Sequence, residues 1–390
     1  MGAGHAHGAH RAHRAEGDGF EVGRGPRAVL LAGLALAGLV TLAAVVWLWP
    51  NGAEVDRIKD EVVFAAPGVT FPNAVVESVA DDGVVAVTVQ EGKGKGTEVT
   101  VTVPPQVVDA GLREGDEVKL QRTPGPPAAD TSYSYFETVR STPLLVMTLV
   151  FVALVLLVAR WRGLFALLGL IFSGAVIWIF MLPALLTGAP ALAVGLAGSA
   201  LIMYVVLYTT HGFSLRTSTA LAGTLVGVLV TAALGTVGAA TTRATGVTDN
   251  GNILQSLVGD LSFQGLFTCA IVIAGLGVLN DVTITQSSSV WEVREAGPTL
   301  SRRQVFASGM RIGRDHIAST IYTIVFAYAG TALAVLLILQ LYGLPFSVLL
   351  TTEDITEEIV RTLASSIGLV LAVPLTTGIA ALVVPGSSSD

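Results

Sequence analysis

Charge and cysteine are both scarce in this sequence. Only 13% of its 390 residues are charged and 52% are hydrophobic, whereas soluble domains carry about 25% charged residues. This balance excludes an ordinary soluble domain and indicates a membrane protein with several spans. The net charge of -7 argues against nucleic acid as a partner, because nucleic acid selects a clustered basic surface. The single cysteine, Cys269, excludes an intrachain disulfide and any metal site built from several cysteines.

Enzyme motifs are missing as well. The sequence has no HExxH, GxSxG, P-loop or paired-cysteine motif, so we expect no catalytic activity, no cofactor and no bound metal. The stretch GLGVLND, which ends at Asp281, is superficially similar to the GxGD of intramembrane aspartyl proteases. It lacks the Gly-Asp adjacency, and no other span carries a partner aspartate. These absences argue against a protease.

What the sequence does have is long apolar runs. Residues 28–49 form the first, which is long enough to cross a hydrocarbon core of about 30 Å and ends in an aromatic belt followed by Pro50. We expect a disordered cytoplasmic tail at 1–27 and a transmembrane anchor at 28–49. A seven-helix membrane domain is expected at 142–384, with a cytoplasmic amphipathic segment at 284–313 and a tail at 385–390. Its predicted spans are 142–159, 163–182, 190–209, 217–240, 261–283, 317–339 and 359–384.

Arginines set the predicted orientation. Cytoplasmic loops carry an excess of Lys and Arg, and eight arginines fall in loops on one side against two on the other. We therefore predict an α-helical polytopic membrane protein with about eight transmembrane helices and both termini cytoplasmic, located in a bacterial plasma membrane. The inside set is Arg160, Arg162, Arg216, Arg294, Arg302, Arg303, Arg311 and Arg314, and the outside set is Arg243 and Arg361.

The only sizeable soluble segment follows the anchor. Short valine-rich or alternating stretches at Ala74–Val79, Val84–Gln90, Glu98–Val103 and Glu117–Arg122 are separated by Gly-rich turns. We predict a small extracytoplasmic β-barrel of OB-like or SH3-like type at 51–122, joined to the membrane by a Pro-rich linker at 123–141. Without a basic groove or an aromatic stripe on these strands, a structural or partner-docking role is expected.

Asp281 is the main functional candidate. The apolar stretch from Gly265 to Leu279 covers only about 22 Å, so a spanning helix must draw in polar residues at one of its ends. An ionisable side chain in a membrane helix costs about 2.5–3.5 kcal/mol on insertion scales and is a functional hypothesis by default. Asp281 is therefore predicted to hold a coupling ion.

Other polar residues are predicted to complete this site. On the same helix they are Asn280, Thr283, Thr285 and Ser287, and on the next span they are His316, Ser319 and Thr323. A carboxylate among hydroxyls and an imidazole is suited to binding and releasing a proton or Na⁺. An alternative stays open, in which Asp281 is an ordinary interface residue paired with Arg311 or Arg314.

Acidic residues gather in the outside loop before the last span. Glu353, Asp354, Glu357 and Glu358 lie within six positions. They could attract cations at an entrance, or they could simply stabilise a solvated helix N-terminus through its dipole. Both readings are open from the sequence.

Long blocks of the membrane half resemble a known family. They are HGFSLRTSTALAGTLVG (211–227), GLGVLNDVTITQSSSVWEVRE (275–295), GRDHIASTIYTIVFAYAGTALAVLLIL (313–339) and EIVRTLASSIGLVLAVPLTT (358–377). They resemble the YibE/F family of bacterial multi-span membrane proteins. The resemblance implies several spans after an extracytoplasmic N-terminal segment, and an aspartate at the position of Asp281. Asn280 departs from the family pattern, which often has methionine there.

A weaker likeness concerns the same region. LNDVTITQSSSVWEVRE, followed by an amphipathic helix and HIASTIYTIVFAYAGTALAVLL, is similar to the SecF half of the SecD/SecF export pair of the resistance-nodulation-division superfamily. That likeness implies a coupling role for Asp281 and a moving role for the outer domain. Two function hypotheses follow. One is an ion-coupled permease or export component, and the other is a non-transporting scaffold that docks a protein partner through its outer domain.

Overall fold

The computed structural model describes residues 24–80, 82–125, 131–258, 261–343 and 345–386. Of the tails predicted at 1–27 and 385–390, residues 1–23 and 387–390 lie outside the described residues. Residues 24–27, predicted as disordered, instead begin the first helix, which starts at Arg24. The chain divides into two compact units, one formed by Asp56–Leu167 and the other by the remaining sequence. The smaller unit holds the β-strands and the larger holds the main helical bundle, and we describe them in turn.

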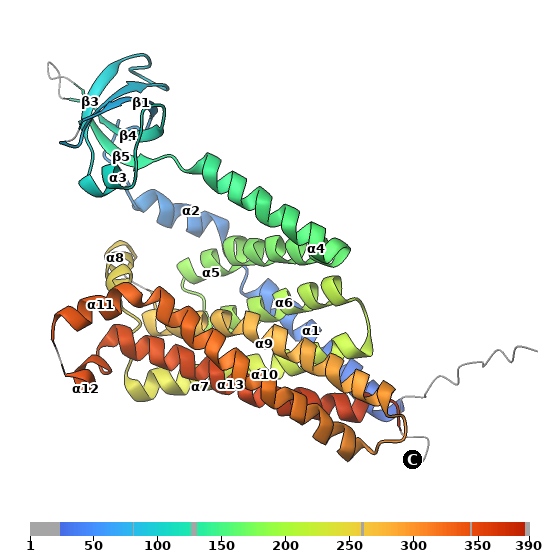
Figure 1. Ribbon diagram of the computed structural model, residues 1–390. Helices are drawn as coiled ribbons and strands as arrows, with labels where there is room; N and C mark the ends of the chain where they lie inside the picture. The colour runs from blue at the N-terminus through green and yellow to red at the C-terminus, as the bar shows by residue number, and fades with distance from the viewer. Residues whose placement is uncertain (1–23, 81, 126–130, 259–260, 344, 387–390) are drawn as a thin grey trace, which may run out of the picture. The chain divides into compact units, whose positions relative to one another are not determined.

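The smaller unit contains a nearly closed, barrel-like sheet of five antiparallel strands (Figure 1). Their order in the sheet is β3-β2-β1-β4-β5, and the two edge strands approach each other. The short helix α3 (Pro105–Asp109) connects β3 to β4. The strand bounds are β1 Asn73–Val79, β2 Val84–Val89, β3 Glu98–Thr102, β4 Glu117–Thr123 and β5 Ser132–Thr138.

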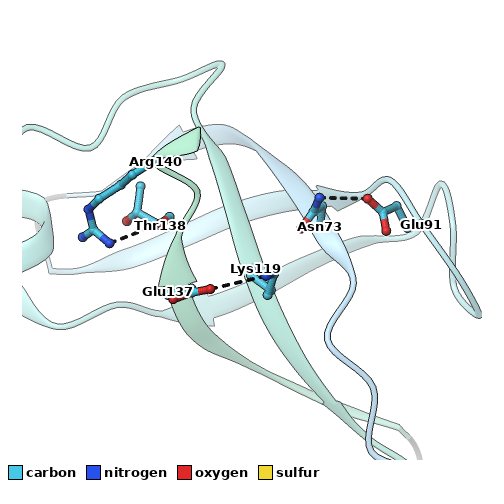
Figure 2. A network of polar contacts seen from close by, with 6 residues as sticks. All are labelled: Asn73, Glu91, Lys119, Glu137, Thr138 and Arg140. Carbon is cyan, nitrogen blue, oxygen red and sulfur yellow. Dashed lines mark hydrogen bonds and ion pairs between the residues drawn. The ribbon is translucent and has the colours of Figure 1, made fainter. Parts of the chain in front are cut away.

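Buried and more exposed residues alternate along the strands of this sheet. Val85, Val87 and Val89 on β2 are all fully buried, and Leu120 on β4 packs into the same core. One face of each strand therefore fills the interior, as the period of two along a strand requires. Outward-facing polar pairs lie on the other side: Asn73 with Glu91, and Lys119 with Glu137 (Figure 2).

Strand β5 corrects the sequence prediction of an irregular linker over 123–141. Its sequence, SYSYFET, pairs along β4 from Ser132 to Thr138, so the sheet extends beyond residue 122. The Tyr133 hydroxyl donates to the carbonyl oxygen of Lys93 at 3.4 Å, which links β5 to the loop between β2 and β3. The sequence did not predict this strand, because the segment is polar and aromatic and follows a run of prolines.

Three phenylalanines form an aromatic cluster on the smaller unit. Phe64 precedes β1 by nine positions, Phe71 lies between it and the strand, and Phe136 lies on β5. Ring centroids of Phe71 and Phe136 are 4.7 Å apart, and those of Phe64 and Phe71 are 5.6 Å apart. Phe64 is 77% exposed, so the cluster presents apolar surface outside the barrel core.

Long apolar helices make up most of the remaining chain. Six described helices are long and apolar enough to cross a membrane, or seven if the bent pair α10–α11 counts as one span. The predicted count of eight is therefore not confirmed. The helices are α1 Arg24–Trp47, α2 Gly52–Glu61, α4 Ser141–Ala175, η1 Val176–Met181, α5 Leu182–Leu186, α6 Ala191–His211, α7 Leu215–Thr242, α8 Asp249–Leu257, α9 Phe263–Ala296, α10 Arg302–Thr331, α11 Leu333–Leu341, α12 Phe346–Leu349 and α13 Glu353–Val383.

The helix α4 contains a sharp break at Arg160. This residue adopts φ 53° and ψ -132°, a conformation that residues other than glycine avoid. A Cβ placed on Gly163 would lie 2.7 Å from the carbonyl oxygen of Val155, although eight residues of continuous helix would separate the two by about 12 Å. The chain therefore reverses at Arg160, between the two predicted spans 142–159 and 163–182.

Close packing of α7, α9 and α13 forms the centre of the larger unit. Gly223 lies directly against the Thr376 side chain, and a Cβ on Gly227 would lie 2.9 Å from Leu279. Gly368 in turn lies directly against Thr231. Small residues let helix backbones approach closely, so these three glycines lie on the packing faces of α7 and α13.

Two further features of these helices bear on the site. Helix α9 runs unbroken from Phe263 to Ala296, so the predicted change from membrane span to amphipathic segment after residue 283 occurs within one helix. Helix α13 contains Pro374, which removes one backbone donor from its hydrogen-bond ladder. Both features lie where the three central helices meet.

Candidate functional site

Part of the predicted site lies in the interface of α9 with α7. Thr283 is fully buried, and its Oγ1 lies 2.6 Å from Oγ1 of Thr224 on α7. Ser287 is also buried and donates to the carbonyl oxygen of Arg216 at 2.8 Å. The structure therefore brings Thr283 and Ser287 together along one helix contact.

Asn280 lies beside this contact with an incomplete set of partners. Its backbone carbonyl oxygen lies 3.2 Å from Thr283 Oγ1. Its side-chain Oδ1 is buried and has no hydrogen-bond partner within the described part of the chain. A buried polar atom left without a partner costs about 1–3 kcal/mol, so this oxygen is a position that an added donor or cation would satisfy.

Asp281 lies on the open side of the same helix. Its side chain is exposed, and Gly277, one turn away, has nothing within 4 Å of an added Cβ. Thr285, one turn further on, is half-buried and its carbonyl oxygen accepts from Ser289 Oγ. No ion pair joins Asp281 to Arg311 or Arg314 among the residues that the structure describes.

The depth of Asp281 follows from helix register. Because Gly227 faces Leu279 and Gly235 faces Ile271, Asp281 is level with about residue 225 of α7. That position is about 15 Å along the axis from the Leu215 end of α7. The carboxylate therefore lies well inside the length of the helix, not at its end.

The predicted partners on α10 occupy a different environment. Ser319 and Thr323 are exposed and His316 is half-buried. Their hydrogen bonds stay within α10: Ser319 donates to the carbonyl oxygen of His316, and Thr323 to that of Ser319. Within the described ranges, no hydrogen bond joins these three residues to α9. As an ion site, the predicted set remains a prediction.

Gln286 is a central polar residue that the sequence analysis did not select. It is only 1% exposed, and its Nε2 donates to the Gly309 carbonyl at 2.8 Å and to Thr377 Oγ1 at 2.7 Å. It thereby joins α9 to α10 and α13. Its offset of three positions from Thr283 places both on one helix face, and that spacing was the available signal.

Hydroxyls without partners extend the polar character of this core. The Oγ1 atoms of Thr219, Thr231 and Thr376 are buried and have no hydrogen-bond partner in the described ranges. All three lie on α7 or α13. Together with Thr224, Thr283 and Gln286 they make the interface of the three central helices polar in its interior, where simple packing would need only apolar side chains.

No group of three or more His, Cys, Asp or Glu side chains in the described ranges could hold a metal ion. The site chemistry is thus one carboxylate, amide oxygens and hydroxyls. Such groups can bind a proton or a monovalent cation.

The long apolar helices and their polar interior define an integral membrane protein. A family model described as YibE/F-like protein matches residues 147–386, which is more than half of the chain. The chain belongs to the YibE/F family, as the sequence blocks indicated. No curated protein and no solved structure matches it.

Proposed function

We propose that this protein is an ion-coupled permease or export component in which Asp281 binds the coupling ion. The observation that supports this role most directly is the position of Asp281, about 15 Å from the end of α7, beside the unpartnered Oδ1 of Asn280. A carboxylate at such depth is costly in lipid and is retained where it serves an ion path.

The proposed coupling ion is a proton or Na⁺. The buried hydroxyls of Thr283 and Ser287 line the inner side of α9, while Asp281 and Thr285 lie on its more open side. A charged side chain that faces hydrocarbon is costly. We therefore place a water-filled path along the open side of α9, with His316, Ser319 and Thr323 of α10 as its proposed further lining.

The proposed topology has eight crossings and cytoplasmic termini in a bacterial plasma membrane. By length and composition, Ser141–Leu186 is one candidate span, but the reversal at Arg160 supports two crossings within it. The bent pair α10–α11 supplies one further crossing. The proposed outer domain is the five-stranded sheet. Its strand order and the helix between β3 and β4 favour the OB-like form over the SH3-like form.

The test is ion-driven flux in proteoliposomes. Asp281→Asn keeps the size of the side chain and removes its charge, so we expect loss of flux with normal expression. Asp315→Asn is the matched control, because Asp315 is also an exposed carboxylate on a neighbouring helix. Unchanged flux in Asp281→Asn would rule out the coupling role.

A second function is favoured by one observation, the aromatic cluster in which Phe64 and Phe136 are exposed and Phe71 is half-buried. Clustered exposed aromatics are typical of protein interfaces. In that case the protein is a membrane scaffold that docks a partner through its outer domain. Phe64→Ser would then abolish function while Asp281→Asn would leave it intact, the reverse of the result expected for a permease.

A further inference from the structure

A cavity with acidic lining lies away from Asp281, at the Glu353 end of α13. It has a volume of about 600 Å³ and opens between α9, α13 and the bend of α10–α11. Its charged and aromatic lining consists of Phe263, Phe267, Tyr328, Asp354, Glu357, Glu358 and Arg361. A volume of this size accommodates a small organic molecule.

Glu357 gives this cavity its chemical character. The residue is only 4% exposed although it carries a carboxylate. The Gly246 backbone hydrogen-bonds the carboxylate, but Oε1 is buried with no hydrogen-bond partner in the parts of the chain described here. A buried carboxylate oxygen that lines a cavity and lacks a donor is a position for an incoming donor.

The charges around the cavity do not balance. Arg361 pairs with Glu358 at 3.1 Å, and its guanidinium lies 5.7 Å from the ring centre of Phe267. Three carboxylates and one guanidinium line the space, which leaves two negative charges in excess (3 − 1 = 2). From the sequence alone, the acidic residues could be explained as stabilising the N-terminus of a helix through its dipole. That effect accounts for solvated carboxylates, and it does not account for a buried one facing a cavity.

The apolar part of the lining favours an organic cation over a bare metal ion. The rings of Phe267 and Tyr328 and the side chains of Leu254, Leu266 and Val335 share the cavity with the acids. Aromatic faces attract cations, and apolar walls require an apolar body on the ligand. A bare metal ion would leave most of this volume empty, and no metal-binding cluster occurs in the described ranges.

We propose that this cavity binds a small organic cation, namely an ammonium group attached to an apolar body. The ammonium would donate to Oε1 of Glu357, with Asp354 at the exposed rim and the apolar body against Phe267 and Tyr328. The inference deepens the proposed function, since it names the substrate class of the permease. The binding site itself rests only on the cavity and its charges.

The experiment uses the full chain in lipid nanodiscs and titration calorimetry. Benzylammonium is the probe, and benzyl alcohol is its neutral match. We expect benzylammonium to bind and benzyl alcohol to bind at least about tenfold more weakly, because a charge-assisted hydrogen bond is lost. Glu357→Gln should weaken benzylammonium by about tenfold or more. Glu292→Gln, an exposed acid on α9, should leave it unchanged.

A second measurement keeps the proposal testable if Glu357→Gln does not fold. Thr331, at the edge of the cavity, is exposed, so Thr331→Cys in a Cys269→Ala background reports access by its alkylation rate. Benzylammonium should slow that rate and benzyl alcohol should not. Equal effects of the two probes, or benzylammonium binding that survives Glu357→Gln, would overturn the proposal.

The two proposals fail separately. Asp281→Asn should leave benzylammonium binding unchanged, because Asp281 does not line this cavity. Absence of binding together with flux that depends on Asp281 would remove the cavity proposal alone. Binding without flux in the wild-type protein would remove the permease proposal alone.

Discussion

The hydroxyl oxygens of Thr224 and Thr283 lie 2.6 Å apart in the buried interface of α7 and α9. Thr224 also donates to the Ala220 carbonyl oxygen at 3.0 Å, so the pair forms a short polar chain between two helices. Such interhelical bonds contribute about 0.6 kcal/mol on average in membrane proteins and up to about 1.7. The pair therefore fixes helix register more than it adds stability.

A double-mutant cycle measures this contact. Thr224→Val and Thr283→Val should each lower the free energy of unfolding by about 0.5–1.5 kcal/mol. The double variant should lose less than the sum, because the second substitution removes an already broken contact. Thr236→Val is the control, since Thr236 is exposed and donates only within its own helix. Strict additivity would show that the two hydroxyls do not interact.

Substitution of Gly223 tests the close approach of α7 and α13. Gly223→Ala should destabilise the bundle by about 1–3 kcal/mol, because the new methyl group meets the Thr376 side chain. Gly277→Ala, where nothing lies within 4 Å of the added carbon, should be neutral or stabilising by up to about 1 kcal/mol. Unfolding in mixed micelles compares the two. An equal response at both glycines would contradict the packing.

Replacing Gln286 by an acidic residue should destabilise the helical bundle. Gln286→Glu replaces the donor to the Gly309 carbonyl with an acceptor, so that contact becomes unfavourable. The Thr377 hydroxyl can donate to the new carboxylate only by giving up its bond to the Val373 carbonyl. We expect a loss of about 3 kcal/mol or more in unfolding free energy. Gln340→Glu changes an exposed residue in the same way and should cost less than about 0.5 kcal/mol. Comparable stability of the two variants would exclude a structural role for Gln286.

Cysteine labelling tests the proposed eight crossings. In a Cys269→Ala background, Arg160→Cys should react with an impermeant thiol reagent from the same side as Arg303→Cys. Lys93→Cys, in the barrel, should react only from the opposite side. Both reference positions are exposed. If Arg160→Cys and Lys93→Cys were labelled from the same side, the segment of α4 between Ser141 and Arg160 would not cross the membrane.

The sequence predicted the regular elements where local pattern and final environment agree. Valine alternation located β1 to β4, and apolar runs located the long helices. It missed β5 because SYSYFET owes its strand form to pairing with β4, a contact distant in sequence. The reversal at Arg160 was predicted as a loop, but its unusual backbone angles depend on the packing of Gly163 against Val155.

The candidate site was predictable only in part, for a related reason. Helical spacing placed Thr283 and Ser287 near Asn280. Which of these side chains would be buried could not be predicted, because it depends on where α7 packs. The polar residues of α10 look like a matching face in sequence, yet Ser319 and Thr323 satisfy their hydroxyls within their own helix. The burial of Glu357 could not be read from an acidic loop, because three separate helices create it.

Pro374 divides α13 into two segments that both pack against α7. Since proline donates no backbone hydrogen bond, the carbonyl of Val370 lacks its usual helical donor and the rod bends there at low cost. On one side of this joint, Gly368 touches Thr231; on the other, Thr377 accepts from Gln286. The segment after the proline carries the contact with Gln286, and the segment before it carries Glu357, so Pro374 separates the two polar regions along one helix.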